Sequence, residues 1–357
     1  MFEDHEVCRQ QARRMGVTFQ SIGPDEVIAI HQQIENSNME VMLLEKAPRV
    51  AIYTPPNTSP WDDAVTLALT WAEVEYDKVW DEDVLKGGLE GCDWLHLHHE
   101  DFTGQFSRFY NGYSERPWLQ DEVKSSQEAA QSMGFQKVWQ LKHAIARRIA
   151  DYVRQGGFLF AMCLAAETLD IALAAGETDI VGPQADGDGV DPEAQNKLDF
   201  SKTMAFKDFR IELDPGVNSF SNIDGHQVNN PPLRKELGYF QLFAFAAKYD
   251  PVPALLTQNH VNYLRDFFGQ STSFNRAVLK DADIILGFEE GKNWVKYIHG
   301  NYGEGAWTFL GGHDPEDPEH RIGDPPTRLE LHKNSAGYRL ILNNLLFPAA
   351  RKKELKT

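Results

Sequence analysis

Cys163 is the residue of this sequence best placed to act as a nucleophile. It follows the apolar run 158–162 and precedes the helical pattern 164–173, so we expect it at a sharp strand-to-helix turn. The N-terminus of a helix stabilises a thiolate, and this arrangement is that of a nucleophile elbow. Ala161 and Ala165 stand where an elbow usually carries glycine. A buried structural cysteine is the other interpretation of the same position.

His313 has the surroundings expected of a general base. It follows an apolar run and Gly311-Gly312, where the missing side chains let the backbone approach a ligand closely. Glu316 comes three residues later and could orient the imidazole, as the third member of a catalytic triad does. The sequence therefore predicts a catalytic constellation of Cys163, His313 and Glu316. A loop histidine paired with neighbouring acids is the alternative.

Residues 96–101 form the densest cluster of groups that could bind a ligand. Strand alternation places His96 and His98 on one face, about 6.6 Å apart, with His99 at the strand end. We predict that this segment forms one wall of a substrate pocket, although satisfied hydrogen bonds at a strand end would produce the same pattern. The predicted substrate-binding residues are His98, His99, Glu100, Asp101, Glu167 and Asp314.

A divalent ion such as zinc is a further hypothesis for the same histidines. Metal binding needs three or four ligands that converge on one point, which two neighbours on a strand do not supply. Another ligand, for example His313, would have to join them. The sequence itself requires no cofactor, so the metal-assisted enzyme remains one of three alternatives beside a cysteine hydrolase and a non-catalytic binding protein.

Alternating strands and helices are expected to position these residues. The predicted strands are 49–54, 76–80, 93–99, 158–162, 294–299 and 306–310, with a turn at 300–305 between the last two. The predicted helices are 61–73, 142–154, 164–173 and 335–346, with Asp62 and Asp63 as caps of the first. This rhythm is typical of a doubly wound parallel α/β sheet, in which ligands bind beyond the carboxyl ends of the strands.

We predict one large domain rather than two. It spans 46–350 and carries two insertions, 102–140 and 183–235, the second of which is expected to contain a strand at 205–213. A helical segment, 1–45, precedes it and a basic tail, 351–357, follows. Because the chain opens directly into a helical pattern, an upstream piece with an export signal could be missing; otherwise the absence of a signal peptide predicts a cytoplasmic location.

Composition narrows the function classes. The chain has 357 residues with 35 Lys+Arg against 53 Asp+Glu, a net charge of −18, and this field repels phosphate backbones and anionic membrane surfaces. We therefore expect a small-molecule substrate, and neither nucleic acid nor a membrane as partner; the oligomeric state is not indicated. The three scattered cysteines, Cys8, Cys92 and Cys163, exclude a disulfide framework and a cysteine-cluster zinc site.

The placement of Cys163 and His313 resembles the class I glutamine amidotransferase-like superfamily, and the closer likeness is to its ThuA-like branch. The segments that carry this likeness are 152–157, 302–309 and 312–316, and it extends over about 48–180 and 290–347. The resemblance implies a flavodoxin-like sheet with helices on both faces. It also implies a hydrolase or amidotransferase-type activity, or sugar and small-molecule binding without covalent chemistry.

The chain also resembles bacterial proteins labelled asparagine synthetase B, through the stretches 61–66, 94–104 and 311–317. Synthetases of that name need a cysteine directly after Met1, where this chain has Phe2, and a Ser-Gly-Gly-x-Asp-Ser pyrophosphate loop that it lacks. Class I amidotransferases carry His-x-Glu, whereas His313 and Glu316 are one residue further apart. Asparagine synthesis is therefore not expected.

Overall fold

The computed structural model describes most of the chain. The described residues are 6–7, 9–10, 20–38, 41–56, 63–214, 216–225, 238–244, 252, 259–320 and 324–353. Cys8, Asp62 and the start of the helix predicted at 61–73 lie outside them.

The chain divides into two compact units, of which the second carries all the candidate site residues. The first unit comprises Met1–Leu43, Phe245–Leu255 and Lys352–Thr357, and its main described element is α2 (Pro24–Asn36). Within this unit the Lys353 ammonium donates to the carbonyls of Ile34, Asn38 and Val41. The second unit comprises Leu44–Ala244 and Leu256–Arg351.

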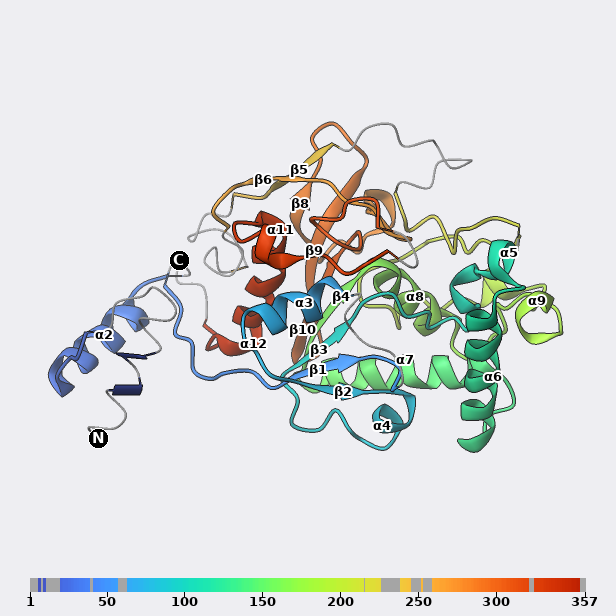
Figure 1. Cartoon of the computed structure of the whole chain (residues 1–357), viewed down its shortest axis with the longest axis horizontal. Helices are drawn as coiled ribbons and strands as arrows, with labels where there is room; N and C mark the ends of the chain where they lie inside the picture. Colours follow the sequence, from blue (N-terminus) through green and yellow to red (C-terminus); the bar gives the residue numbers. More distant parts are fainter. Residues whose placement is uncertain are drawn as a thin grey trace. The chain divides into compact units, whose positions relative to one another are not determined.

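The second unit is built on a parallel core. Its strands lie in the order β2 (Tyr76–Val79), β1 (Val50–Tyr53), β3 (Trp94–Leu97), β4 (Phe158–Met162) and β10 (Gly305–Leu310), and each neighbouring pair is parallel (Figure 1). Every residue of β1, β3 and β4 is buried, as expected for strands covered on both faces. The predicted α/β class with a parallel core is confirmed.

Antiparallel strands extend this core beyond β10. They follow in the order β9 (Trp294–Tyr302), β8 (Ile284–Phe288), β5 (Tyr239–Leu242) and β6 (Tyr263–Arg265), while β7 (Phe274–Asn275) pairs with β9. The described residues thus form a mixed sheet of ten strands. It is less parallel than a purely doubly wound fold.

Two predictions inside the sheet need correction. The turn predicted at 300–305 is shorter, because β9 continues to Tyr302 and Gly303 takes the positive φ of the turn; Gly300 lies against the Trp307 ring, where a side chain would clash. The segment 205–213 makes isolated bridges rather than a strand. The backbone amides of residues 204–206 donate to the Asp170 carboxylate rather than to a neighbouring strand.

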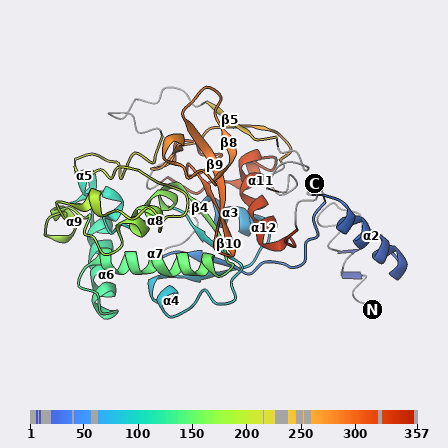
Figure 2. The same ribbon diagram turned by 180° about the vertical axis from the view of Figure 1, so that it is seen from behind.

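Helices cover both faces of the core. On one face α7 (Val138–Arg154) contacts both α4 (Asp81–Leu85) and α8 (Cys163–Ala175), and on the other α3 (Ala64–Trp71) packs against α11 (Ala336–Leu342) (Figures 1 and 2). Helical crossovers between parallel strands place helices on the faces of such a sheet. The remaining short helix near the C-terminus is α12 (Leu346–Ala349).

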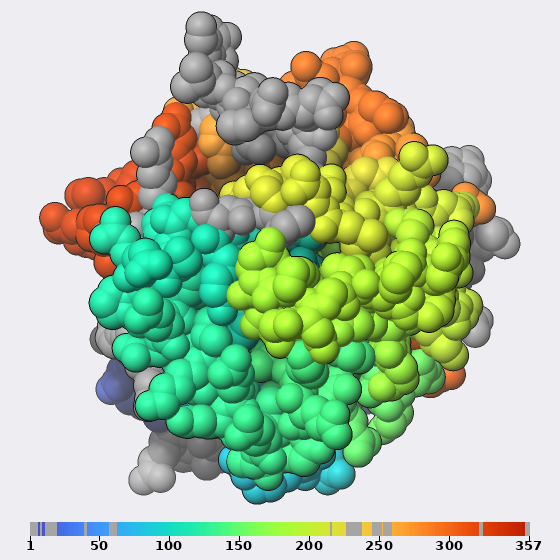
Figure 3. Space-filling model, turned by 90° about the vertical axis from the view of Figure 1, so that its right-hand side faces the viewer, coloured from blue at the N-terminus to red at the C-terminus, as the bar shows by residue number. Residues whose placement is uncertain are grey.

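The described parts of the two predicted insertions lie side by side at one end of this unit (Figure 3). The first contains α5 (Tyr110–Tyr113) and α6 (Pro117–Ser132), and the second begins with α9 (Pro183–Asp186). The 3₁₀ turns of the second unit are η2 (Phe106–Arg108), η3 (Ala194–Lys197), η4 (Arg276–Val278), η5 (Leu329–Leu331) and η6 (Asn343–Leu345).

Candidate functional site

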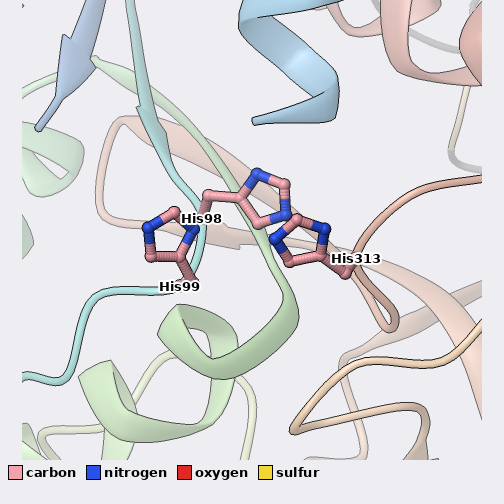
Figure 4. Close-up of side chains that lie close together, drawn as sticks. All are labelled: His98, His99 and His313. Atoms are coloured by element: carbon pink, nitrogen blue, oxygen red, sulfur yellow. The ribbon is translucent and has the colours of Figure 1, made fainter. Parts of the chain in front are cut away.

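Three histidines converge at the carboxyl edge of the parallel core. His98 and His99 follow β3, and His313 follows β10, so the two segments flank the end of β4. One ring nitrogen from each histidine lies within 4.8 Å of the others. The rings of His98 and His313 are 4.4 Å apart, and those of His99 and His313 are 5.8 Å apart (Figure 4). His98 is buried whereas His99 is exposed, so the cluster has one buried wall and one face open to solvent.

Close backbone packing fixes His313. A side chain at Gly311 would overlap the Thr272 carbonyl, and Gly312 has φ +91° with the Phe267 carbonyl 2.6 Å from where a Cβ would be. The His313 amide donates to the Phe268 carbonyl at 2.7 Å. Only glycines permit this approach, which explains why two of them precede the histidine.

Asp63 is the second buried feature of this edge. Its carboxylate caps α3 by accepting from the amides of Val65 and Thr66, which confirms its predicted capping role. The same carboxylate contacts two histidines: Oδ2 lies 3.1 Å from His96 Nε2, and Oδ1 lies 2.8 Å from His98 Nδ1. The second contact is close but falls short of an aligned hydrogen bond. Asp63 therefore caps α3 and also contacts His98 of the histidine cluster.

The electrostatics of the cluster follow from burial. Burial raises the pKa of Asp63, but His98 and His96 outweigh it and hold that pKa well below its usual value. Burial, together with His98 and His99, lowers the pKa of His313 well below its usual value. Among the described residues, His98 Nε2 and His313 Nδ1 are buried without a hydrogen-bond partner. Such orphaned atoms are uncommon in folded proteins and call for an explanation, an ion being one.

Cys163 occupies the elbow that its position predicts. It has φ +49° at the junction of β4 and α8, a backbone conformation that residues other than glycine rarely adopt. Burial raises the pKa of the thiol, and the nearby amides of Ser271, Gln270 and Leu164 offset only part of this effect. Gly269 packs so closely that a Cβ there would lie 2.7 Å from the sulfur. The buried thiol is therefore covered by the loop that contains Gly269.

The predicted pairing of Cys163 with His313 is not seen. The ring neighbours of His313 are His98, His99 and His320, the last stacked on it with centroids 4.6 Å apart. Within the described part of the chain no hydrogen bond joins the thiol to this imidazole. The sequence could not distinguish a histidine that faces the elbow from one that faces the next strand end.

Glu316 does not orient His313, which corrects the third member of the predicted constellation. Its carboxylate lies 3.0 Å from His332 Nδ1. The reason is the turn that Asp314 organises: its Oδ1 accepts from the amides of Glu316 and Asp317, and its Oδ2 accepts from the hydroxyls of Thr327 and Tyr338. Asp314 is buried in these contacts, so it anchors the turn rather than facing a ligand.

The acids that follow the strand-end histidines shape the loop. Glu100 accepts from the His98 amide at 2.8 Å, which helps hold the turn after β3. Asp101 accepts from the amides of Thr103, Gln105 and Ser107. Both are among the predicted substrate-binding residues, but the loop itself occupies the carboxylate of Asp101.

Glu167 lies one turn into α8 from Cys163 and is fully buried. Ser221 and Ser271 donate to its two oxygens, each at 2.6 Å. Burial, and next the charge of Asp224, raise the pKa of Glu167 to about 7. This predicted substrate ligand joins α8 to two loops.

Sequence reasoning missed the contacts of Asp63 with the histidines. The sequence predicts Asp63 only as a helix cap, and the histidines that it contacts are more than thirty residues away (His96 is 33 further on). No local pattern signals a contact of that separation. The sequence does show the polar character of the strand end at 96–101, the segment in which both histidines lie.

No protein-family profile matches the chain, and no curated protein matches it either. Solved structures do match. The "Cytoplasmic Protein STM3548" of Salmonella typhimurium is 13% identical with a TM-score of 0.40, over 85% of this chain and 100% of that one. The "Cytoplasmic Protein STM1381" of Salmonella typhimurium LT2 is 11% identical with a TM-score of 0.41, over the same shares. A protein of Thermoplasma acidophilum that is provisionally described as part of a GMP synthase is 9% identical with a TM-score of 0.38, over 85% of this chain and 96% of that one.

Of the helices in the described ranges, none combines the length and the apolar character that crossing a bilayer requires.

Proposed function

We propose that this protein is a metal-dependent hydrolytic enzyme acting on a small molecule, with His98, His99 and His313 as ligands of a divalent cation. The observation that carries the proposal is the convergence of three imidazoles whose nitrogens lie within 4.8 Å of one another. The buried Nε2 of His98 supports it, since this nitrogen has no hydrogen-bond partner among the described residues and an ion could use it. Three histidines with one open position are a donor set of catalytic zinc sites.

The chemistry of such a site is hydrolysis by an activated water. A divalent cation held by neutral imidazoles lowers the pKa of a bound water from 15.7 to about 7. The resulting hydroxide would add to the carbonyl carbon of an ester or amide, the bond to the alkoxide or amine would break, and the leaving group would take up a proton equivalent to the one that the water released. The exposed His99 marks the side from which substrate and water would enter.

The experiment begins with chelator-treated protein reloaded with Zn²⁺, Co²⁺ or Mn²⁺. We expect about one ion per chain by elemental analysis and metal-dependent hydrolysis of p-nitrophenyl acetate or a panel of small amides. His98→Ala should abolish both. His332→Ala is the matched control, because that histidine lies outside the cluster and pairs with Glu316.

Two outcomes would overturn this function. Protein that retains no ion after reloading has no metal site, and a His332→Ala variant that loses as much metal as His98→Ala shows a non-specific effect. Retention of one ion without any turnover would leave a metal-containing binding protein in place of an enzyme.

Cys163 carries the second candidate function, a hydrolase that forms a covalent acyl-enzyme. Its φ of +49° at the strand-to-helix junction favours this candidate, as do three nearby backbone amides that lower the pKa of the thiol against the effect of burial. The thiolate would attack a carbonyl carbon, expel the leaving group and release the acid when water cleaves the thioester. Turnover that Cys163→Ala abolishes but metal removal leaves intact would select it over the metal site.

We also infer that the fold is a flavodoxin-like variant of the class I amidotransferase-like superfamily, of the ThuA-like branch. The parallel strand order β2-β1-β3-β4-β10 supports this, with Cys163 directly after the fourth strand. The segments 152–157 and 302–309 support the ThuA-like branch. An experimental structure with a different order of the parallel strands would contradict it.

A further inference from the structure

We propose that Asp63 is the positioning residue of the metal site, setting which nitrogen of His98 is available to the ion; this rests on the proposed function. Asp63 does not belong to the group of His98, His99 and His313 but touches His98, and it forms a second, fully buried group of possible ligands with His96 and His98. Histidines that bind metals usually present their second nitrogen to a carboxylate or carbonyl, which fixes the ring and its tautomer.

The carboxylate of Asp63 is itself held in place. The residue is 5% exposed, and its Oδ1 accepts from the amides of Val65 and Thr66 at the start of α3. Its Oδ2 faces His96 Nε2 at 3.1 Å, and the other nitrogen of His96 faces the Phe160 carbonyl at 3.1 Å. The helix and a buried ring therefore fix both oxygens before any ion binds.

This fixed carboxylate selects the orientation of His98. Oδ1 lies 2.8 Å from His98 Nδ1, and although this contact is not an aligned hydrogen bond, the negative charge beside Nδ1 favours the proton there in a neutral ring. Nε2 is then left with its lone pair, and this buried nitrogen has no hydrogen-bond partner among the described residues. The opposite tautomer would place an N–H where the ion must bind.

If Asp63 served only to cap α3, replacing it by asparagine would leave metal binding unchanged. As an N-cap, asparagine is about as effective as aspartate, so Asp63→Asn preserves the start of α3. It removes the negative charge that holds the Nδ1 proton. The variant therefore separates the capping role from the positioning role.

The test compares Co²⁺ binding by the wild-type chain, Asp63→Asn and Asp63→Glu, measured from the visible absorption of the bound ion. We expect Asp63→Asn to bind Co²⁺ about 10- to 100-fold more weakly, with a shifted absorption band, and Asp63→Glu to recover part of the affinity. Ser335→Ala, which removes the N-cap of α11, is the control for loss of a cap alone and should bind Co²⁺ as the wild type does.

A second measurement needs no variant. Imidazole ¹⁵N shifts of His98 in the metal-free wild type should show the proton on Nδ1, and a proton on Nε2 would overturn the positioning role even if Asp63→Asn fails to fold. Wild-type protein that binds no Co²⁺ would end the proposed function together with this inference. Equal affinity and identical spectra for wild type and Asp63→Asn would end this inference alone.

Discussion

The carboxyl edge of the core holds two candidate centres that differ in how their polar atoms are satisfied. At Cys163, the 269–271 loop covers the sulfur, and burial raises the pKa of the thiol. At the three-histidine cluster, buried nitrogens of His98 and His313 have no hydrogen-bond partner among the described residues, and His99 is exposed. The sulfur of the first centre is covered by the chain itself, whereas the second centre has buried ring nitrogens without a hydrogen-bond partner among the described residues.

This difference matters because leaving a buried polar group unpaired costs about 1–3 kcal/mol. A fold retains such groups where something else compensates for them, and functional sites are where this is expected. The strained backbone at Cys163 would otherwise favour the thiol as the reactive group. The two centres share the 267–272 loop, which hydrogen-bonds to the backbone of Gly312 and His313. A change at one centre can therefore be detected at the other.

The largest effect is expected from removing a histidine side chain that would bind the metal ion. His313→Ala should weaken Zn²⁺ binding by more than the 10- to 100-fold that loss of an outer-shell partner causes, because a direct bond to the ion is lost. Competition with a chromophoric chelator measures the affinity. Cys163→Ala should leave the affinity unchanged. If Cys163→Ala weakens binding and His313→Ala does not, the contrast between the two centres is reversed.

The next effect concerns stability and pH at Glu167. Its pKa is about 7 in the folded chain, against about 4.3 for an unfolded glutamate. Between these values the folded chain holds a proton that the unfolded chain has released, so the free energy of unfolding falls as pH rises through this window. The loss is at most about 4 kcal/mol, from about 1.4 kcal/mol per pKa unit.

Glu167→Gln should reduce this dependence but not remove it, because burial also raises the pKa of Asp170 to about 6 and that of Asp283 to about 8. Urea unfolding of both proteins at pH 5 and pH 8 gives the difference, and the wild type should lose more stability between these values than the variant does. Parallel pH profiles for the two proteins would show that Glu167 does not hold the proton. Because Ser271 donates to this carboxyl, the result also reports how firmly the loop over Cys163 is held.

Sequence patterns predicted the parallel core and much of the carboxyl edge. Short buried runs such as 50–53 and 158–162 stand out because every residue in them is apolar, and the positions of Cys163 and His313 after their strands follow directly. What could not be predicted was the direction of each side chain. Glu316 is close to His313 in sequence but pairs with His332, because amides of the 314–317 turn donate to Asp314.

The sequence predicted the strand β9 and its pairing with β10, but the other antiparallel strands and the histidine contacts of Asp63 could not be predicted, for a related reason. Strands of two or three residues such as β6 and β7 carry no measurable alternation, and their pairing is set by long-range contacts. Asp63 has the sequence context of an ordinary helix cap, and capping is indeed one of its roles. Its contacts with His96 and His98 exist only because β3 lies beside β1 in the sheet.

A smaller effect is expected where the loop packs on the thiol. Gly269→Ala would place a Cβ 2.7 Å from the Cys163 sulfur and 3.0 Å from Gly312, and such overpacking costs about 1–3 kcal/mol. Denaturant unfolding of the single and double variants tests it. Adding Cys163→Ala should recover part of the loss, since the sulfur is removed but the Gly312 contact remains. Strictly additive losses would mean that Gly269 does not press on the sulfur.

The smallest effect is expected from a substitution of Glu316. Its pair with His332 joins side chains that are 28% and 32% exposed, so screening by solvent limits its contribution to less than about 1 kcal/mol. Glu316→Gln should therefore leave the melting temperature, the affinity for Zn²⁺ and any turnover close to those of the wild type. A catalytic triad of Cys163, His313 and Glu316 would instead lose much of its rate, because the orienting carboxylate would be gone. Steady-state kinetics of this one variant would thus test whether Glu316 is the third member of such a triad, which its pair with His332 argues against.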